Sequence, residues 1–413
     1  MRIRSLLLIV IVLSVLMAAC KKEEAAKGPT LTGEVPIGYI CASPDQLEPS
    51  GEAVKMAIDD VNAYAKSLGR DITFRLYVES AEGSAEKALE NAQTLYARGV
   101  RFVVGSNWSG QNKAILPYAN ENHLLLVSDG STAAELAIAN DYLFRLPTTD
   151  ATQTLALSIG VLREIGIDGL VVLQRADSWG DGNARDIATN FASQGGEIAG
   201  SVRYASDKTE FAAEMKELNE VVTAAIAKYG EGKVAIGVWS FEEITAILNE
   251  AANYDALMSV PWIGSNGITQ STRIIEESPD IAKNMMILSM MLGVTESDKW
   301  QAFRDRYYAK LNLEPGAYVT FAYDAVWLIA KTILEVGEYD PVKAQAIFPQ
   351  VAGDYFGAGG WYKLNEFGDR HGAAFEVWTI VDEGGAPVWK KSAVFDMASM
   401  KTSWVFRPAW LTP

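Results

Sequence analysis

The sequence predicts an α/β protein of two lobes, each built on a parallel β-sheet flanked by helices. From residue 35 onwards, short apolar runs rich in Val, Ile and Leu alternate with longer segments of helical period. Few of the short runs show the period-two alternation of a half-exposed strand, which indicates sheets covered on both faces. The chain has 413 residues. That is more than a single hydrophobic core usually supports, and two domains are therefore expected.

Residues 1–20 have the features of a lipoprotein signal peptide. Arg2 and Arg4 precede an apolar run over 6–17, and Ala18-Ala19-Cys20 follows it. The run is too short for a transmembrane span, and small residues directly before a cysteine are what a lipoprotein signal peptidase requires. We expect Cys20 to be lipidated and to anchor the protein on the periplasmic side of a membrane or at the cell surface. A plain secretory signal with a chance cysteine is the alternative.

Composition limits the kinds of partner that this protein is expected to bind. Residues 21–34 are polar and low in complexity, which predicts a flexible tether. The formal net charge is -16. Such an acidic surface repels phosphate backbones, so nucleic acid is not an expected partner. Once Cys20 is lipidated, Cys41 is the only other cysteine and no internal disulfide is expected.

The expected elements follow one another as strand and helix. The helix over 51–67 is typical, because Val54, Ile58 and Val61 recur at three-to-four spacing and predict an apolar stripe against the sheet. Further helices are expected over 299–311 and 317–336. The predicted parallel strands cover residues 36–40, 71–78, 101–104, 123–127, 169–173, 198–204, 233–238, 261–264 and 285–288. The last part is expected to form antiparallel hairpins from residues 361–362, 374–381 and 388–394.

The two βα series predict lobes that are discontinuous in sequence. Crossings between the lobes are expected at 146–150, at 284–293 and before 357, and three connecting segments would form a hinge. The predicted first lobe comprises 35–148 and 292–355. The predicted second lobe comprises 149–291 and 356–395, with 396–413 as a C-terminal extension.

Two loops at strand ends are candidates for ligand binding. Residues 105–110 follow the strand 101–104, and residues 128–132 follow the strand 123–127. In a parallel sheet, ligands bind beyond the carboxyl ends of the strands, where helix N-termini present unpaired N–H groups. The small hydroxyl residues Ser109 and Thr132 suit a carboxylate held by hydroxyls and amides. The alternative is that both residues only cap helices.

Catalytic and cofactor signals are missing from the sequence. The two histidines, His123 and His371, have no metal partner at ligand spacing. The segment 179–185 fails the dinucleotide fingerprint at its third glycine position, and 227–234 fails the phosphate-loop pattern. No enzyme activity, cofactor or metal is expected.

Several short motifs resemble one known family along almost the whole body of the chain. These motifs are residues 57–62 (AIDDVN), 103–106 (VVGS), 144–145 with 149–150, 178–182 (SWGDG), 323–325 (YDA), and 360–362 with 365 and 368–369. In order and spacing the chain resembles the periplasmic substrate-binding proteins of branched-chain amino acid ABC transporters, the leucine/isoleucine/valine-binding type. The resemblance implies a type I periplasmic binding protein, a Venus flytrap that closes on a small ligand. It also implies delivery to a membrane permease that works with separate ATPase subunits.

The resemblance also implies a set of ligand-binding residues. The first lobe would hold a ligand carboxylate through hydroxyls and amides of two loops, and aromatic side chains would form the walls of the cleft. For each aromatic residue, core packing is the alternative. The residues implied for the carboxylate are Asn107, Trp108, Ser109, Gly130, Ser131 and Thr132. Those implied for the walls are Trp179, Trp239 and Tyr318.

The chain departs from the family at the position that meets the ligand ammonium group. Amino-acid binders of the family place an acidic residue where this chain has Asn266. An amide accepts a hydrogen bond but supplies no charge, and an unpaired buried cation is costly. Either Asp129, Asp177 or Glu242 supplies the charge, or the ligand is not an α-amino acid. Relatives of this fold also serve amides, urea-like molecules and aromatic carboxylates.

Two other functional classes remain open from the sequence. A domain of this type can report its ligand to a membrane receptor instead of feeding a transporter. An enzyme is the second alternative, although the chain lacks a recognisable nucleophile, base and metal set. Tight binding without turnover is the expectation.

Overall fold

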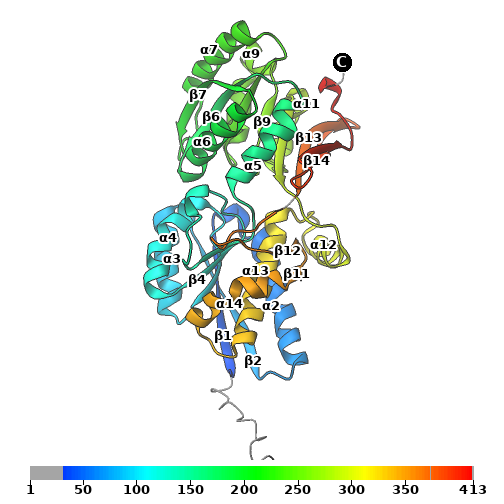
Figure 1. Ribbon diagram of the computed structural model, residues 1–413. Coiled ribbons are helices and arrows are strands. Elements are labelled where there is room, and N and C mark those ends of the chain that lie inside the picture. Colours follow the sequence, from blue (N-terminus) through cyan, green and yellow to red (C-terminus); the bar gives the residue numbers. More distant parts are fainter. Residues whose placement is uncertain (1–30, 373, 412–413) are drawn as a thin grey trace, which may run out of the picture.

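The computed structural model describes residues 31–372 and 374–411, which form two lobes stacked one above the other (Figure 1). The first lobe contains a 5-stranded parallel sheet in the order β2-β1-β3-β4-β5. The second lobe contains an 8-stranded sheet in the order β15-β14-β13-β10-β9-β8-β6-β7. The strands are β1 (Gly33–Cys41), β2 (Ile72–Ser80), β3 (Phe102–Gly105), β4 (Leu125–Ser128), β5 (Leu143–Arg145), β6 (Gly169–Ala176), β7 (Glu197–Ala205), β8 (Val234–Trp239), β9 (Trp262–Gly264), β10 (Ile287–Leu292), β13 (Ala374–Glu383), β14 (Ala386–Asp396) and β15 (Lys401–Trp404).

Both faces of the first sheet are covered by helices, as its apolar strands predict. Successive residues of β1 point to opposite faces, so Val35 and Ile37 pack with α2 and α13, whereas Ile40 packs with α3 and α4. The helices of this lobe are α2 (Pro49–Ser67), α3 (Ala85–Ala97), α4 (Ser109–Asn122), α12 (Asp298–Leu311), α13 (Ala317–Val336) and α14 (Pro341–Gly353). The predicted α/β class with two parallel sheets is confirmed.

The second lobe adds an antiparallel edge to its parallel strands. β10 pairs antiparallel with β13, which begins the predicted hairpin with β14. β15 extends this edge, so part of the predicted C-terminal extension belongs to the sheet. Its helices are α5 (Asp150–Leu157), α6 (Ser178–Ser193), α7 (Ala212–Tyr229), α8 (Ile244–Ala251), α9 (Asp255–Met258), α10 (Thr272–Glu277) and α11 (Pro279–Asn284), and a π-helical turn, Ser158–Arg163, follows α5.

The chain passes between the sheets three times. It leaves the first sheet after β5, within the predicted segment 146–150, and leaves the second after β10, at the end of the predicted range. It returns to the second sheet only at β13, so the third crossing follows Arg370 and does not precede Gly357. The short strands β11 (Phe356–Gly357) and β12 (Gly360–Trp361) therefore stay beside the first lobe.

Two buried carboxylates explain why the third crossing comes late. Asp324 of α13 accepts hydrogen bonds from the backbone amides of Ala358 and Gly359, at 3.0 and 2.7 Å. Asp369 forms a bidentate ion pair with Arg145 of β5. Both anchors hold the segment 356–370 against the first lobe.

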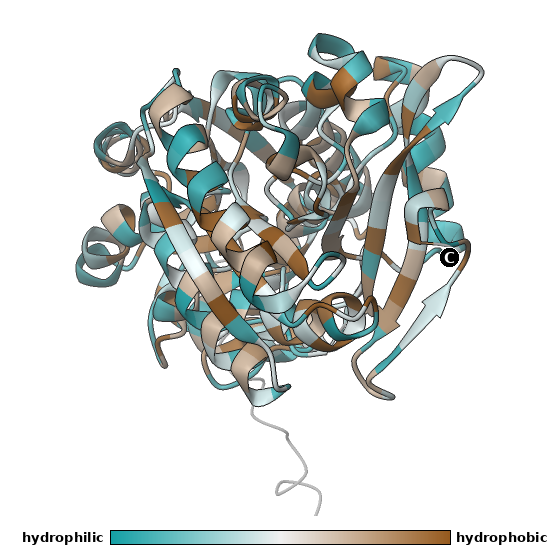
Figure 2. Ribbon diagram, turned by 90° about the horizontal axis from the view of Figure 1, so that it is seen from above, coloured by the Kyte–Doolittle hydropathy of each residue, from teal (hydrophilic) through white to brown (hydrophobic). Residues whose placement is uncertain are grey.

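The hydropathy pattern agrees with this architecture. Seen from above, hydrophobic and hydrophilic residues alternate along the peripheral strands and helices (Figure 2). Within residues 31–372 and 374–411, no helix is long and apolar enough to cross a membrane. The predicted signal peptide, the lipidation site Cys20 and residues 21–30 of the predicted tether lie outside the described residues.

Candidate functional site

A cavity of about 520 Å³ lies between the lobes, at the carboxyl ends of strands from both sheets. The first lobe lines it from the loops after β1, β3 and β4, and from the start of α13. The second lobe lines it from the loops after β6, β8 and β9. Among the residues implied for ligand binding, those that line the cavity are Asn107, Trp108, Ser109, Gly130, Trp179, Asn266 and Tyr318.

One end of the cavity is suited to a carboxylate. Helix α4 begins at Ser109, and its N-cap residue Trp108 makes no side-chain capping hydrogen bond. The first amides of the helix and the helix dipole therefore favour an anion at this end.

The Ser109 hydroxyl connects the two predicted binding loops. Its oxygen accepts hydrogen bonds from the backbone amides of Thr132 and Ala133, at 3.2 and 3.1 Å, and from the Ser131 hydroxyl at 3.2 Å. Because a hydroxyl oxygen has only two lone pairs, these contacts use its capacity to accept, and a ligand oxygen could bind Ser109 only by accepting its proton. Ser131 and Thr132 thus stand behind Ser109, and neither lines the cavity.

Glycine is required at one position where these loops meet their neighbours. A Cβ on Gly267 would lie 2.3 Å from the carbonyl oxygen of Ser240, far inside van der Waals contact with backbone. A Cβ on Gly130 would lie 2.1 Å from Nδ2 of Asn107, so a side chain there would displace the Asn107 side chain.

Three aromatic rings line the cavity and form a stack that joins the lobes. Phe241 stacks on Trp179 of its own lobe, with ring centroids 4.5 Å apart, and on Trp108 of the first lobe at 4.9 Å. The guanidinium of Arg175 lies 4.3 Å from the centroid of the Phe241 ring. The aromatic wall therefore contains Phe241, which the sequence analysis did not single out.

Trp239 does not take part in this wall. It ends β8, is fully buried in the core, and does not line the cavity. The loop residue two positions further along, Phe241, is the one that reaches the cleft. The physical reason is that a strand-end residue packs under the sheet edge, whereas residues of the following loop project beyond it.

Acidic groups also line the cavity. Glu242 comes from the second lobe and Asp45 from the first. Burial raises the pKa of Glu242; the charge of Asp45 adds to this rise, whereas Arg273 opposes it. Arg273 is itself bonded to Glu277, at 2.8 Å. A cation bound beside Glu242 and Asp45 would relieve the repulsion between the two carboxylates.

Asn266 and Tyr318, which also line the cavity, link the lobes. Nδ2 of Asn266 donates to the Tyr318 hydroxyl at 2.6 Å. The Oδ1 atom of Asn266 is buried and has no hydrogen-bond partner among the described residues. It can accept a hydrogen bond from a ligand N–H group.

The other two candidate acids lie outside the cavity lining. Asp177 is bonded to Arg175 at 2.6 Å and caps α6 through the amide of Gly180 at 2.8 Å. Asp129 is fully buried beside Asn107, and burial raises its pKa to about 6 although the Asn107 side chain opposes the rise. Of the three acids, only Glu242 lines the cavity.

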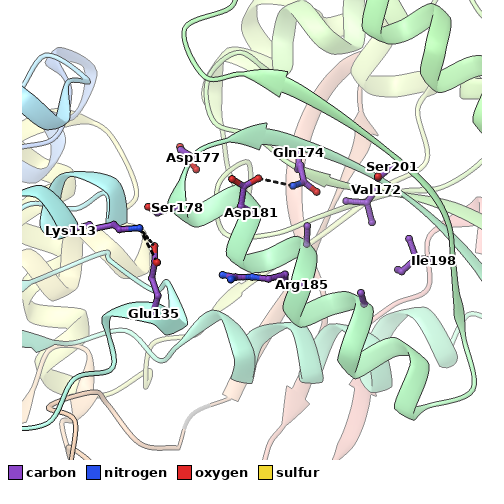
Figure 3. Close-up of a pocket in the computed structure, with 12 residues that line it drawn as sticks. Lys113, Glu135, Val172, Gln174, Asp177, Ser178, Asp181, Arg185, Ile198 and Ser201 are labelled. Atoms are coloured by element: carbon purple, nitrogen blue, oxygen red, sulfur yellow. Dashed lines mark hydrogen bonds and ion pairs between the residues drawn. The ribbon is translucent and has the colours of Figure 1, made fainter.

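A second hollow, of about 660 Å³, opens between α4 and α6 (Figure 3). Lys113 and Glu135 point toward each other across its first-lobe side, with a shortest Nζ–Oε distance of 3.0 Å (Figure 3). On its second-lobe side, Asp181 is bonded to Gln174 at 2.9 Å and to Arg203 at 2.8 Å. These side chains are bonded to one another, and of the candidate residues named from the sequence only Asp177, itself bonded to Arg175, lines this hollow. We therefore place the candidate site in the cavity that Ser109 and Glu242 share.

Comparison with known proteins gives matches over most of the chain. The protein family described as receptor family ligand binding region matches residues 49–383. The chain is 26% identical over 370 residues to an uncharacterised protein of Methanocaldococcus jannaschii, covering 85% of this chain and 86% of that protein. It is 24% identical over 289 residues to the leucine-, isoleucine-, valine-, threonine- and alanine-binding protein of Pseudomonas aeruginosa, covering 70% and 74% of the two chains.

The fold is also similar to solved structures. A leucine-binding protein of Thermotoga maritima superposes with a TM-score of 0.72 at 19% sequence identity. The match covers 88% of this chain and 99% of that chain. The two-lobed architecture is thus shared over nearly the whole length of that protein.

Proposed function

The chain belongs to the receptor family ligand binding region, and on that premise we propose that it is an extracytoplasmic solute-binding protein for a small amino-acid-like ligand. Its homologues are periplasmic solute-binding proteins that bind amino acids or aromatic acids. We propose that the ligand is captured between the lobes and delivered to the permease of an ABC transporter. Lipidation at Cys20 would keep the protein beside that permease.

The charge pattern of the cavity carries the ligand proposal. The uncapped N-terminus of α4 and the hydroxyl of Ser109 favour a carboxylate on the first-lobe side. Glu242 and Asp45, which line the same cavity, favour a cation. A zwitterion would satisfy both groups of residues, and the aromatic rings of the cavity would contact its side chain. Glu242 would therefore supply the negative charge that Asn266 lacks.

A ligand without an ammonium group is the second candidate. The unpartnered Oδ1 of Asn266 favours it, because a neutral amide or urea-like N–H can donate there without adding charge. Aromatic carboxylates also fit the stack of Trp108, Phe241 and Trp179. Ligand sensing by a membrane receptor would use the same site. We propose no catalytic role, since the family consists of solute-binding proteins.

Calorimetric titration of the full chain tests the choice between a ligand with and a ligand without an ammonium group. The two compounds are leucine and 4-methylpentanoate, its analogue without the amino group. We expect leucine to bind and the Glu242→Gln variant to bind it about tenfold to hundredfold more weakly, the usual effect of losing a charged hydrogen bond. The affinity for 4-methylpentanoate should not fall in that variant. Glu210→Gln removes an equal charge from an exposed site of the same lobe and is the control.

A second variant separates the two ends of the ligand. Ser109→Ala should weaken both compounds, because both carry the carboxylate. If wild type binds only 4-methylpentanoate, the amino-acid proposal is wrong and the second candidate stands. If Glu242→Gln weakens both compounds equally, the cation site has been misplaced.

A further inference from the structure

A second cavity, of about 640 Å³, adjoins the binding cavity on the side of α12 and the β13–β14 hairpin. The two cavities share six lining residues, all from the loop after β9 and from the start of α13. These are Asn266, Thr269, Gln270, Thr272, Tyr318 and Val319. The two cavities therefore lie next to each other, and the shared residues form the wall between them.

The hydrogen bond between Asn266 and Tyr318 joins the two sides of that wall. It links the second lobe to the first through a single side-chain pair. A ligand oxygen that accepts the Nδ2 hydrogen bond of Asn266 in place of the Tyr318 hydroxyl would open the way into the adjoining cavity. Such an exchange costs little, because one hydrogen bond replaces another.

The adjoining cavity is suited to an uncharged group. Its walls carry three indole rings, those of Trp300, Trp378 and Trp389, with aliphatic side chains such as Met291 and Val294 between them. Trp389 is held in place by its indole N–H, which donates to the Ser271 carbonyl oxygen at 3.0 Å. A flat apolar or aromatic group would find extensive contact here.

The charged residues that line this cavity are all bonded to one another. Lys391 contacts Glu296 at 2.9 Å and Glu376 at 3.0 Å. Arg304 is bonded to Glu314 by a bidentate contact. Because each charge already has a partner, a charged ligand group would have to break an ion pair to bind.

We propose that the adjoining cavity is an accessory subsite for the uncharged apolar tail of a carboxylate ligand whose head lies in the binding cavity. The inference rests on the proposed solute-binding function and extends its ligand class. The ligands would be longer than a branched-chain amino acid and would end in an aryl or similarly apolar group.

A series of ligands of increasing length tests this subsite. The probes are leucine, phenylalanine and phenylalanine homologues with one and with three extra methylene groups, together with the same compounds without the amino group. Dissociation constants are measured by calorimetry on the full chain. We expect the affinity to rise by about tenfold or more once the phenyl ring reaches the subsite, as burial of one ring predicts.

Val294→Phe is the informative variant, because Val294 lines only the adjoining cavity and the larger side chain would fill it. It should remove the gain with chain length and leave leucine or 4-methylpentanoate binding unchanged. Val342→Phe makes the same change at a 49% exposed position of α14 and should keep the gain. Trp300→Leu removes an aromatic wall by a different change and should also reduce the gain.

The outcomes separate this inference from the proposed function. If leucine binds but longer ligands bind no more tightly, the subsite is overturned and the proposed function stands. The same holds if the gain in affinity with ligand length survives Val294→Phe. A gain confined to the compounds without an amino group supports the subsite but overturns the proposed ammonium site. Failure of every compound in both series overturns both proposals.

Discussion

Asp150, the first residue of α5, is a fully buried carboxyl group where the chain enters the second lobe. Its backbone amide donates to the carbonyl oxygen of Thr132 at 2.8 Å and so ties the crossing to a binding loop. Burial raises the pKa of its carboxyl group from 3.8 to about 7. Since the folded state holds the proton more tightly than the unfolded state, the contribution of Asp150 to stability depends on pH.

The sign of this dependence follows from the raised pKa. Below pH 3.8 the carboxyl group is protonated in both the folded and the unfolded state, and its burial does not destabilise the folded state. Above about pH 7 it is charged in both states, and burial of the charge is unfavourable. Stability is thus lost as pH rises from about 4 to about 7. A shift of this size corresponds to roughly 4 kcal/mol in the free energy of unfolding.

Replacement of Asp150 by Asn should remove this dependence. We expect the variant to gain stability over wild type progressively between pH 4 and pH 7, because the amide has no proton to lose. Urea unfolding at a series of pH values gives the difference in free energy. Asp207→Asn changes an exposed carboxylate and should show no such trend. A difference between Asp150→Asn and wild type that does not vary with pH would contradict the expectation.

At the residue scale, the sequence could place some site residues and not others. Ser109 and Gly130 follow strand ends directly, and both line the cavity as such positions suggest. Phe241 could not be chosen over Trp239, because which residue clears the sheet edge depends on where β8 ends. Periodicity locates a strand only to within a few residues, and two positions separate a core side chain from a cleft side chain.

At the scale of elements, Arg145 connects β5, a binding loop and the late segment 356–370. Its guanidinium forms two hydrogen bonds with Asp369, the shorter 2.5 Å, and donates to the Ala133 carbonyl oxygen at 2.6 Å. Both side chains of the ion pair are only 1% exposed. The carboxylate therefore holds Arg145, and Arg145 holds the loop that carries Ser131 and Thr132.

Asp369→Asn should destabilise the protein strongly, because it leaves a buried guanidinium without its counter-charge. The expected loss is about 3–5 kcal/mol in the free energy of unfolding. Ligand affinity should fall as well, since the loop at Ala133 loses its fixed support. Asp305→Asn removes an exposed carboxylate from Arg304, which keeps its contact with Glu314, and should change stability by less than about 1 kcal/mol.

The double replacement Arg145→Met with Asp369→Leu checks the cause. If the loss in Asp369→Asn comes from an unpaired charge, replacing both partners by apolar side chains should recover much of it. An equal loss in the double variant would show that packing, and not charge, is responsible. Chemical denaturation of the full chain gives all of these free energies.

The regular elements were largely predictable from pattern, and the irregular ones were not. α13 occupies the predicted range 317–336, because its apolar residues recur at helical spacing over five turns. β5 has only three residues, too few to show a period. α14 contains Pro349, a residue that normally argues against a helix interior. The late third crossing depends on Asp324 and Asp369, whose partners are distant in sequence and leave no local signal.

At the scale of the whole molecule, the lobes meet through side chains that line the ligand cavity. Trp108 of the first lobe stacks on Phe241 of the second, and Tyr318 of the first accepts a hydrogen bond from Asn266 of the second. Three connecting segments join the lobes, and contacts of this kind exist only while the lobes are together. The same closed arrangement is therefore stabilised both by these contacts and by a ligand that binds between the lobes.

This linkage predicts that the stack between Trp108 and Phe241 contributes to ligand affinity. A double-mutant cycle on Trp108→Ala and Phe241→Ala, with ligand affinity as the measurement, should give a coupling of about 0.5–1.5 kcal/mol, the usual range for an aromatic pair. The matched cycle uses Tyr96 and Tyr118, whose rings meet within the first lobe at 5.8 Å. That pair exists whether or not the lobes close, so its coupling to affinity should be near zero. Equal coupling in the two cycles would mean that closure is not linked to binding. Coupling confined to the pair between the lobes would mean that the energy of ligand binding is shared with the contact that closes them.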